Sequence, residues 1–455
     1  MKNLNTRQHF ALGLAGALLL GSTALAGVSQ EEANKLGNQL TPMGSEAAGN
    51  ADGSIPAWDG GIKKPPFPHT SGDFYKNPYS GDQPLYTITS GNAGQYASVL
   101  SEGHQALLKK FGTYKMIVYP TRRSCAYPDF VYAAAKKNAV TGGLESGGAG
   151  VKGAVMAWPF PIPKQGVEII WNHNLRYRGF KLKRQFAAIA PTAGGDFTPI
   201  EVQDNVLFQY SDPQYSDTSQ LKNISLKYSQ RTMSPPRRAG NVILVHETIN
   251  QLAGPRKAWV YSPGTRRVRR APNIEYDNPQ SYSDGLQTSD NFDVYNGSPD
   301  RYEWTIKGKQ EMIIAYNTYE FQSPSHSYKD LAKPNHINQD ILRYEKHRVW
   351  NVEGKLRADA RHIYAKRTFF VDEDGWNIAA ANLYDGQGKL WRVQEAHLLN
   401  FYDMPLCANN SEIVYDLQAG RYVLQGVKNQ LKQLDFSAKM SNGDFTPQAI
   451  RKLGR

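Results

Sequence analysis

The sequence lacks the signatures of the common catalytic and metal sites. It has no H-E-x-x-H or C-x-x-C spacing for zinc and no G-x-S-x-G for a serine nucleophile. No G-x-G-x-x-G leads into a predicted helix, and the glycine-rich stretch 141–153 lacks the Gly-Lys-Ser/Thr ending of a phosphate loop. Asp372-Glu373-Asp374-Gly375 lacks the spaced acidic pattern of a calcium loop, so we interpret it as a solvated hairpin turn. We therefore expect no metal, no cofactor and no enzyme.

One catalytic alternative remains open from the residues. Carboxylates scattered along the predicted strands could converge inside a sheet as acid and base, although nothing in their spacing requires it. They are Glu168, Glu247, Glu345 and Glu395. A hydrolase is therefore the third hypothesis for this chain.

Cysteine is scarce, since the chain holds only Cys125 and Cys407. In an oxidising compartment two thiols usually pair, and this bond would tie the N-terminal part to the end of the strand-rich region. The alternative is a pair of free buried thiols. We favour the disulfide.

No stretch is apolar and long enough to cross a bilayer. The apolar run Ala11 to Leu20 is too short, follows the cations Lys2 and Arg7, and precedes an A-x-A pattern that ends at Ala26. This order is typical of a cleaved leader, so residues 1–26 are predicted to be a signal peptide cut after Ala26. We expect a soluble, monomeric protein in a bacterial periplasm. There its net charge of +12 favours anionic headgroups, acidic partners or simple solubility, and not nucleic acid.

What the chain has in abundance is strand sequence. Between residues 342 and 401, runs of β-branched and aromatic residues alternate with turn residues such as Asp374-Gly375. Neither face of these strands is cleanly polar, so we expect a sheet that is covered on both faces or curled around something. The predicted strands are Arg343–Val352, His362–Asp372, Trp376–Asp385 and Leu390–Phe401.

A second strand-rich region precedes this one. Turn signals spaced about ten residues apart predict an antiparallel meander, with strands at Val167–Tyr177, Phe180–Ala190, Asn205–Tyr210, Leu221–Ser229, Val242–Gln251, Arg256–Tyr261 and Arg266–Ala271. The polar segment Asp277–Gly308 interrupts it and is expected at the mouth of the sheet, as a lid. After it we predict a strand at Trp304–Ile314, a helical piece at Glu412–Gln418 and a strand at Arg421–Leu424.

Helices are predicted mainly near the ends of the chain. Apolar stripes predict helices at Ala93–Phe111 and Asp129–Ala139, and Thr446-Pro447 begins a small C-terminal helix. The predicted organisation is a leader at 1–26, an irregular extension with helices at 27–150, a β domain at 151–435 and a tail at 436–455.

Arginine is concentrated in one predicted strand, at Arg266, Arg267, Arg269 and Arg270. Four arginines in five positions must occupy both faces of a strand. We expect either salt bridges to carboxylates across the sheet or a docking edge for anionic partners or headgroups.

Motifs along the mature chain carry a resemblance to a known family. They include Gly49-Asn50-Ala51-Asp52-Gly53-Ser54-Ile55-Pro56-Ala57-Trp58, Tyr119-Pro120-Thr121-Arg122-Arg123, Trp158-Pro159-Phe160-Pro161-Ile162-Pro163 and His347-Arg348-Val349-Trp350-Asn351-Val352-Glu353. With these motifs the sequence resembles the outer-membrane lipoprotein-sorting proteins of unknown function that are related to the LolA/LolB carriers.

This resemblance implies an α+β fold dominated by strands. The implied architecture is a LolA/LolB-like curved antiparallel half-barrel with covering helices, here with a long irregular N-terminal extension. It implies a carrier or chaperone that holds a lipid or other hydrophobic ligand in an apolar groove and works with an RND-type exporter and an outer-membrane β-barrel protein. A non-catalytic structural subunit of such a complex is the second hypothesis. The family assigns no catalytic residues.

Large aromatic residues are the candidates for lining the groove, with ordinary core packing as the alternative for each. They are Trp171, Trp259, Tyr261, Trp350, Phe369, Trp376, Tyr384 and Trp391.

Overall fold

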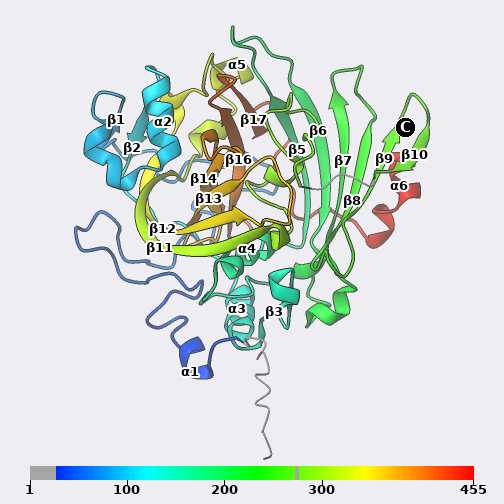
Figure 1. The fold of residues 1–455 in the computed structure, drawn as a ribbon, viewed down its shortest axis with the longest axis horizontal. Helices are drawn as coiled ribbons and strands as arrows, with labels where there is room; N and C mark the ends of the chain where they lie inside the picture. Colours follow the sequence, from blue (N-terminus) through cyan, green and yellow to red (C-terminus); the bar gives the residue numbers. More distant parts are fainter. Residues whose placement is uncertain (1–26, 272–275, 455) are drawn as a thin grey trace, which may run out of the picture.

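A single large sheet organises the protein. The computed structural model describes residues 27–271 and 276–454, and its main sheet has 15 strands (Figure 1). These are β1 (Tyr86–Ile88), β2 (Met116–Val118), β5 (Lys181–Ile189), β6 (Ile200–Leu207), β7 (Ile224–Ser234), β8 (Val242–Thr248), β9 (Lys257–Ser262), β10 (Arg267–Arg270), β11 (Tyr302–Ala315), β12 (Tyr344–Leu356), β13 (Lys366–Asp372), β14 (Ile378–Tyr384), β15 (Leu390–Phe401), β16 (Leu406–Asp416) and β17 (Arg421–Val427). A two-stranded sheet pairs β3 (Gly143–Glu145) with β4 (Gly150–Lys152).

The main sheet joins two antiparallel meanders. One runs from β11 to β17 and the other from β5 to β10, and β17 pairs with β5 between them, with Leu424 opposite Ile189. The short strand β2 adds a parallel contact to β12, which makes the sheet mixed. In the described residues the terminal strands β1 and β10 do not pair with each other. The expectation of a β-dominated fold with some helices is confirmed.

Two sequence predictions about local structure are wrong. The segment predicted as a strand at Val167–Tyr177 is the helix α4 (Gly166–Leu175), because Gln165 and Glu168 form a capping box that starts a helix. A short apolar run without clear periodicity fits both structures, and the cap decides. The helical piece predicted at Glu412–Gln418 is instead the end of β16.

The predicted first helix is divided in two. A 3-10 helix, η1 (Ala93–Val99), is followed by α2 (Glu102–Lys110). Ser101 separates them because its side chain accepts a hydrogen bond from the backbone of His104 and begins a new helix. The second predicted helix is α3 (Asp129–Thr141), which extends two residues beyond the prediction.

The central strands are buried on both sides. Every residue of β14 is buried, as are all residues of β15 after its first two. Helix α2 packs against β14 and β15, and the irregular N-terminal segment reaches the turn after β13, where Trp376 Nε1 donates to Met43 O at 2.9 Å. The expected two-sided cover is confirmed.

A disulfide fastens the N-terminal part to the sheet. Cys125 and Cys407 are bonded, with their Cα atoms 5.5 Å apart and 282 residues between them in sequence. Trp58 Nε1 donates to the carbonyl of Cys125, and Ile55 is 1% exposed, so the Gly- and Pro-rich lead is held on the body. The pairing agrees with the sequence prediction.

The structure tests only some of the predictions about membrane spans, the leader and the domain division. Among the described residues no helix is long and apolar enough to cross a membrane. The predicted leader and its cut after Ala26 lie outside the described residues. Strands β1 and β2, from the predicted extension, belong to the same sheet as the predicted β domain, and the tail helix α6 (Pro447–Leu453) packs against β8, β9 and β10. The four-part division itself stays a prediction.

Candidate functional site

A cavity of about 370 Å³ is walled on one side by β5 to β9. Most of the residues that line it alternate along these strands, as expected when one face of each strand points inward. They are Leu182, Arg184 and Phe186 of β5, Val206 of β6, Leu226, Tyr228 and Gln230 of β7, Ile243, Val245 and Glu247 of β8, and Val260 of β9. The volume falls in the range of small-molecule sites.

The opposite wall comes from distant parts of the chain. It consists of the residues 408–412 of β16, the end of α4 with Trp171 and Leu175, and Leu434 and Phe436 of the tail. Since β16 and β9 are far apart in the strand order, one cavity that touches both shows that the sheet bends around it.

The segment after β10 forms the entrance. Residues 278–282, 292–293 and 295–298 line the cavity, and Pro279 and Ser281 among them are exposed, so the cavity opens to solvent there. The sequence placed the polar insertion 277–308 at the mouth of the sheet; residues between 278 and 298 line the cavity there, whereas 302–308 belong to β11.

The charged groups of the cavity wall are paired with each other. Asp293 binds two arginines, accepting from Arg176 Nη2 and Arg178 Nη1 at 2.6 Å each. Burial opposes the ionisation of Asp293, but these two guanidinium groups outweigh it and hold its pKa below the ordinary value.

The other two arginines of the wall are also neutralised. Arg184 Nε lies 3.0 Å from Asp204 Oδ2, and Arg256 Nε lies 2.7 Å from Glu247 Oε2. The cavity therefore presents apolar and hydrogen-bonding surface with little uncompensated charge, which suits a largely apolar ligand.

Glu412 is the exception in this wall, because no cation lies within salt-bridge distance of it in the described residues. Its carboxylate accepts from the backbone N–H groups of Asp293 and Val294 at 3.2 and 2.9 Å. Burial raises the pKa of Glu412 from 4.5 to about 7, against the effect of these hydrogen bonds.

We expect Glu412 to make stability depend on pH. A carboxyl whose pKa is raised by folding keeps its proton longer in the folded state, so its contribution is full below pH 4.5 and is lost as the pH rises to about 7. The stability of Glu412→Gln relative to the unmodified protein should therefore increase across this window, by on the order of 2 kcal/mol. Urea unfolding at several pH values measures the difference, and parallel curves would contradict it.

Most of the aromatic residues predicted to line a groove do not line this cavity. Only Trp171 does. Trp350, Phe369, Trp376 and Trp391 belong to the main hydrophobic core, and Tyr384 is buried beside α2 with its hydroxyl on Glu102. Trp259 and Tyr261 lie on the opposite face of β9, under α6. The correction has a physical reason: the richest aromatic sequence belongs to the strands buried on both sides, where rings fill the core.

The four predicted basic residues lie at the free edge of the sheet. The register places Arg269 opposite Val260 of the cavity face and Arg270 opposite Trp259 of the other face, so both faces are occupied as predicted. The prediction of salt bridges across the sheet is wrong, because none of the four arginines has an ion pair among the described residues. All four are exposed.

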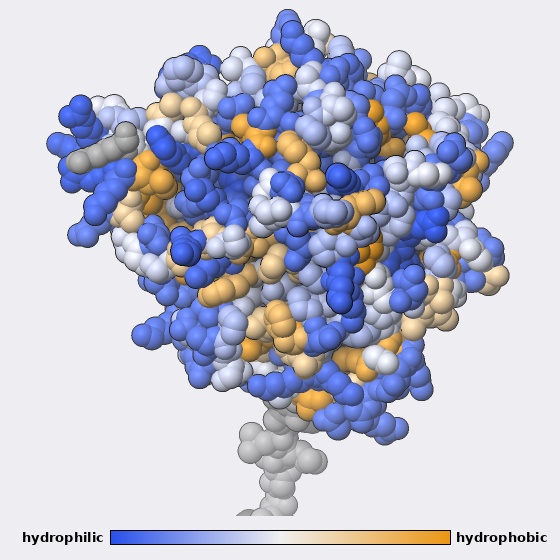
Figure 2. All heavy atoms as spheres, turned by 180° about the vertical axis from the view of Figure 1, so that it is seen from behind, coloured by the Kyte–Doolittle hydropathy of each residue, from blue (hydrophilic) through white to orange (hydrophobic). Residues whose placement is uncertain are grey.

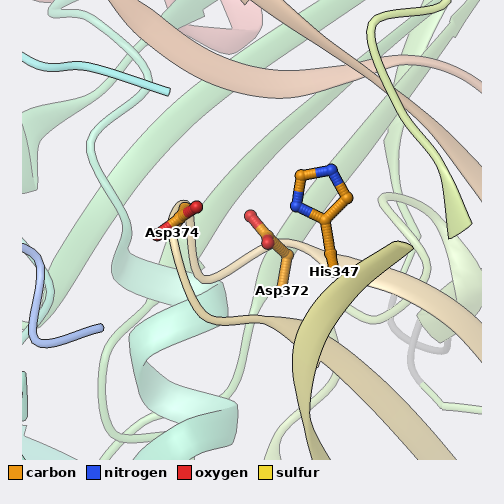
Figure 3. Close-up of side chains that lie close together, drawn as sticks. All are labelled: His347, Asp372 and Asp374. Carbon is orange, nitrogen blue, oxygen red and sulfur yellow. The ribbon is translucent and has the colours of Figure 1, made fainter. Parts of the chain in front are cut away.

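A second cluster of chemically capable groups lies at the turn after β13. His347 of β12, Asp372 and Asp374 converge there, with ligand atoms within 4.8 Å of one another (Figure 3). The three side chains are buried, and so is Glu373 between the two aspartates. The prediction of a solvated hairpin turn is therefore wrong, because the N-terminal segment covers this turn.

Two of the three groups of this cluster already have partners within the protein. Arg123 forms a fork on Asp374, with Nε and Nη2 at 2.8 and 2.7 Å from the two carboxylate oxygens. His347 Nε2 lies 3.0 Å from Glu345 Oε2. Asp372 keeps Oδ1 without a hydrogen-bond partner among the described residues, and burial together with Asp374 raises its pKa well above the ordinary value. We therefore expect a neutral Asp372 beside the paired Asp374, an arrangement that needs no metal ion.

This assignment predicts opposite behaviour for the two aspartates. Asp372→Asn replaces a neutral acid by a neutral amide and should change the free energy of unfolding by less than about 1 kcal/mol. Asp374→Asn leaves Arg123 without its carboxylate and should cost more. Thermal unfolding with and without added Zn²⁺ or Ca²⁺ measures both; a metal-dependent rise in Tm that Asp372→Asn removes would contradict the assignment.

The cavity residues that sequence reasoning missed are mainly polar. Arg176, Arg178 and Asp293 meet across more than a hundred residues of sequence, and no local pattern signals such a pair. A partial signal existed in β5, where Leu182, Arg184 and Phe186 alternate with lysines or other polar residues. Alternation identifies a common face but not which face turns inward.

Comparison with known protein families identifies the family of this chain. A family profile described as "Protein of unknown function (DUF1329)" matches residues 87–451. The chain belongs to the DUF1329 family. A DUF1329 relative, the uncharacterized protein PA3922 of Pseudomonas aeruginosa, is 48% identical over 444 residues, which cover 97% of each chain.

Solved structures similar to this DUF1329 chain include three of low sequence identity. A domain named for outer-membrane lipoprotein sorting, from Vibrio parahaemolyticus, is 14% identical with a TM-score of 0.44, covering 63% of this chain and 98% of that one. A DUF1329 protein from Desulfovibrio piger is 13% identical with a TM-score of 0.39, covering 60% and 92%. The LolA superfamily protein NE2245 of Nitrosomonas europaea is 13% identical with a TM-score of 0.36, covering 62% and 98%.

Proposed function

We propose that this protein is a periplasmic carrier or chaperone that binds a lipid or another hydrophobic ligand in the cavity between β5–β9 and β16. The single observation that carries the proposal is the cavity itself: it is lined by one face of five strands, is mainly apolar and opens to solvent. The wall of bent strands acts as the half-barrel that the sequence resemblance implied.

The energetics favour an apolar guest. Each buried methylene group contributes about 0.8 kcal/mol, so a chain of about ten carbons would gain about 8 kcal/mol before the entropic costs of binding. The wall provides apolar partners for such a chain in Leu182, Phe186, Val206, Val245 and Val260. Because the arginines of the wall are already paired with carboxylates of the protein, the ligand does not need an anionic group to neutralise them.

The proposal assigns no chemistry to the cavity. The arginines of its wall form ion pairs with carboxylates of the protein. We therefore assign ligand binding to the cavity and no catalytic step. We further propose that the cargo passes between this protein and an RND-type exporter with an outer-membrane β-barrel protein, as the sequence resemblance implies. The predicted leader and the disulfide support a place in the periplasm.

Titration with a neutral environment-sensitive fluorophore, N-phenyl-1-naphthylamine, tests the proposal. Binding of about one molecule per chain, with displacement by long-chain fatty alcohols but not by short ones, is expected. Absence of binding by folded protein would overturn it. If folded protein that does not bind the probe still binds to purified envelope membranes, the structural-subunit hypothesis replaces the carrier hypothesis.

A further inference from the structure

Positive charge is concentrated where three separate segments meet. The segments 218–246, 256–271 and 445–454 contain no Asp or Glu. They carry Arg231, Arg237 and Arg238 in and after β7, Arg266, Arg267, Arg269 and Arg270 around β10, and Arg451 and Lys452 in α6. We call these nine residues the basic rim. None of them has an ion pair among the residues that the structure describes.

Packing brings the three segments together. Phe445 and Ile450 of the tail are buried against Val242, Leu244 and Tyr261, so α6 is fixed on the outer face of β8 and β9. The turn between β7 and β8 reaches the end of α6, where a Cβ on Gly240 would lie 2.9 Å from Gly454 O. Figure 2, seen from behind, shows many hydrophilic residues at the left edge, where this part of the sheet lies. The three segments therefore meet at one end of the sheet.

The basic rim borders the cavity entrance. Arg238 lies over the ring of Tyr282, with its guanidinium carbon 5.6 Å from the ring centroid, and Tyr282 lines the cavity together with Asn241. Arg269 stands opposite Val260, which is also a lining residue. Met233, in the same hairpin as Arg237 and followed by two prolines, is 37% exposed.

We infer that the basic rim docks the protein on an anionic lipid bilayer, with the cavity entrance turned toward the membrane. Nine cations that form no ion pair with the described residues suit a diffuse layer of phosphate groups, to which each cation near the surface adds attraction. The exposed Met233 and Pro236 supply a small apolar contact with the headgroup region. This inference rests on the proposed function for its purpose, since docking would let a lipid-like cargo enter or leave.

Co-flotation with vesicles tests the docking. The purified protein should float with vesicles that contain phosphatidylglycerol and stay behind with vesicles of phosphatidylcholine alone. Binding should weaken strongly between about 50 mM and about 500 mM NaCl, because exposed charges are screened. The variant Arg237→Gln/Arg266→Gln/Arg267→Gln/Arg270→Gln should partition about 30-fold or more weakly.

A variant with the same loss of charge elsewhere is the control. Lys109, Lys110, Lys136 and Lys137 are exposed on α2 and α3, away from the rim, and their replacement by Gln should change partitioning little. Equal loss in both variants, equal binding to both kinds of vesicle, or no binding at all would overturn the inference. Probe binding in the cavity is measured separately, so rim-dependent docking without probe binding would reject the carrier and not the docking.

Discussion

Filling the cavity from β7 is expected to weaken ligand binding by about 100-fold. Leu226 lines the cavity and is only partly buried, so Leu226→Trp should place an indole ring in the space of the guest. A ligand that loses contact with about four methylene groups loses about 3 kcal/mol, which corresponds to this factor. Titration with N-phenyl-1-naphthylamine measures the change.

Met233→Trp is the matched control for this variant. Met233 belongs to the same strand but is exposed and does not line the cavity, so its replacement should leave the affinity within about twofold. If Leu226→Trp binds the probe as the unmodified protein does while remaining folded, the cavity is not where the ligand lies.

Removing Arg123 is expected to cost about 3–5 kcal/mol of stability, because it leaves buried carboxylates without their cation. The side chain of Arg123 is 2% exposed and forms the fork on Asp374, and its Nη2 lies 3.6 Å from Glu373. It also donates to the carbonyl of Glu46 at 2.8 Å, which holds the N-terminal segment on the sheet. Urea unfolding of Arg123→Ala measures the loss.

The neighbouring arginine provides the control. Arg122 is 45% exposed, and its partner Asp82 keeps a second cation in Arg343, 2.7 Å away. Arg122→Ala should therefore cost about 1 kcal/mol or less. Where Arg123→Ala fails to fold, Arg123→Lys keeps the charge but loses the fork and should fold with intermediate stability. Equal stabilities for Arg122→Ala and Arg123→Ala would refute the role given to the cluster.

Most of the strands could be predicted from the sequence alone. Alternation and turn residues located most strands of both meanders within a few residues, because hydrophobic period and turn chemistry are local. Local sequence failed at α4, where a cap and an apolar run fit two structures, and at the end of β16, whose partner strands decide its conformation.

The cavity was harder to predict than the fold. Its location depends on how β9 comes to face β16, which follows from the bend of the whole sheet and not from any segment. Aromatic density pointed to Phe369 and Trp376, yet these residues fill the core. Arg176 and Arg178 of the wall pair with Asp293, more than a hundred residues further along the chain, and such pairs leave no mark in local sequence.

Mass spectrometry of organic extracts from protein purified without detergent shows directly whether the cavity carries a ligand. We expect a lipid or similar hydrophobic molecule at close to one per chain, and its loss from Leu226→Trp but not from Met233→Trp. Folded, unmodified protein that yields no such molecule, and that takes none up from added lipid, would contradict it.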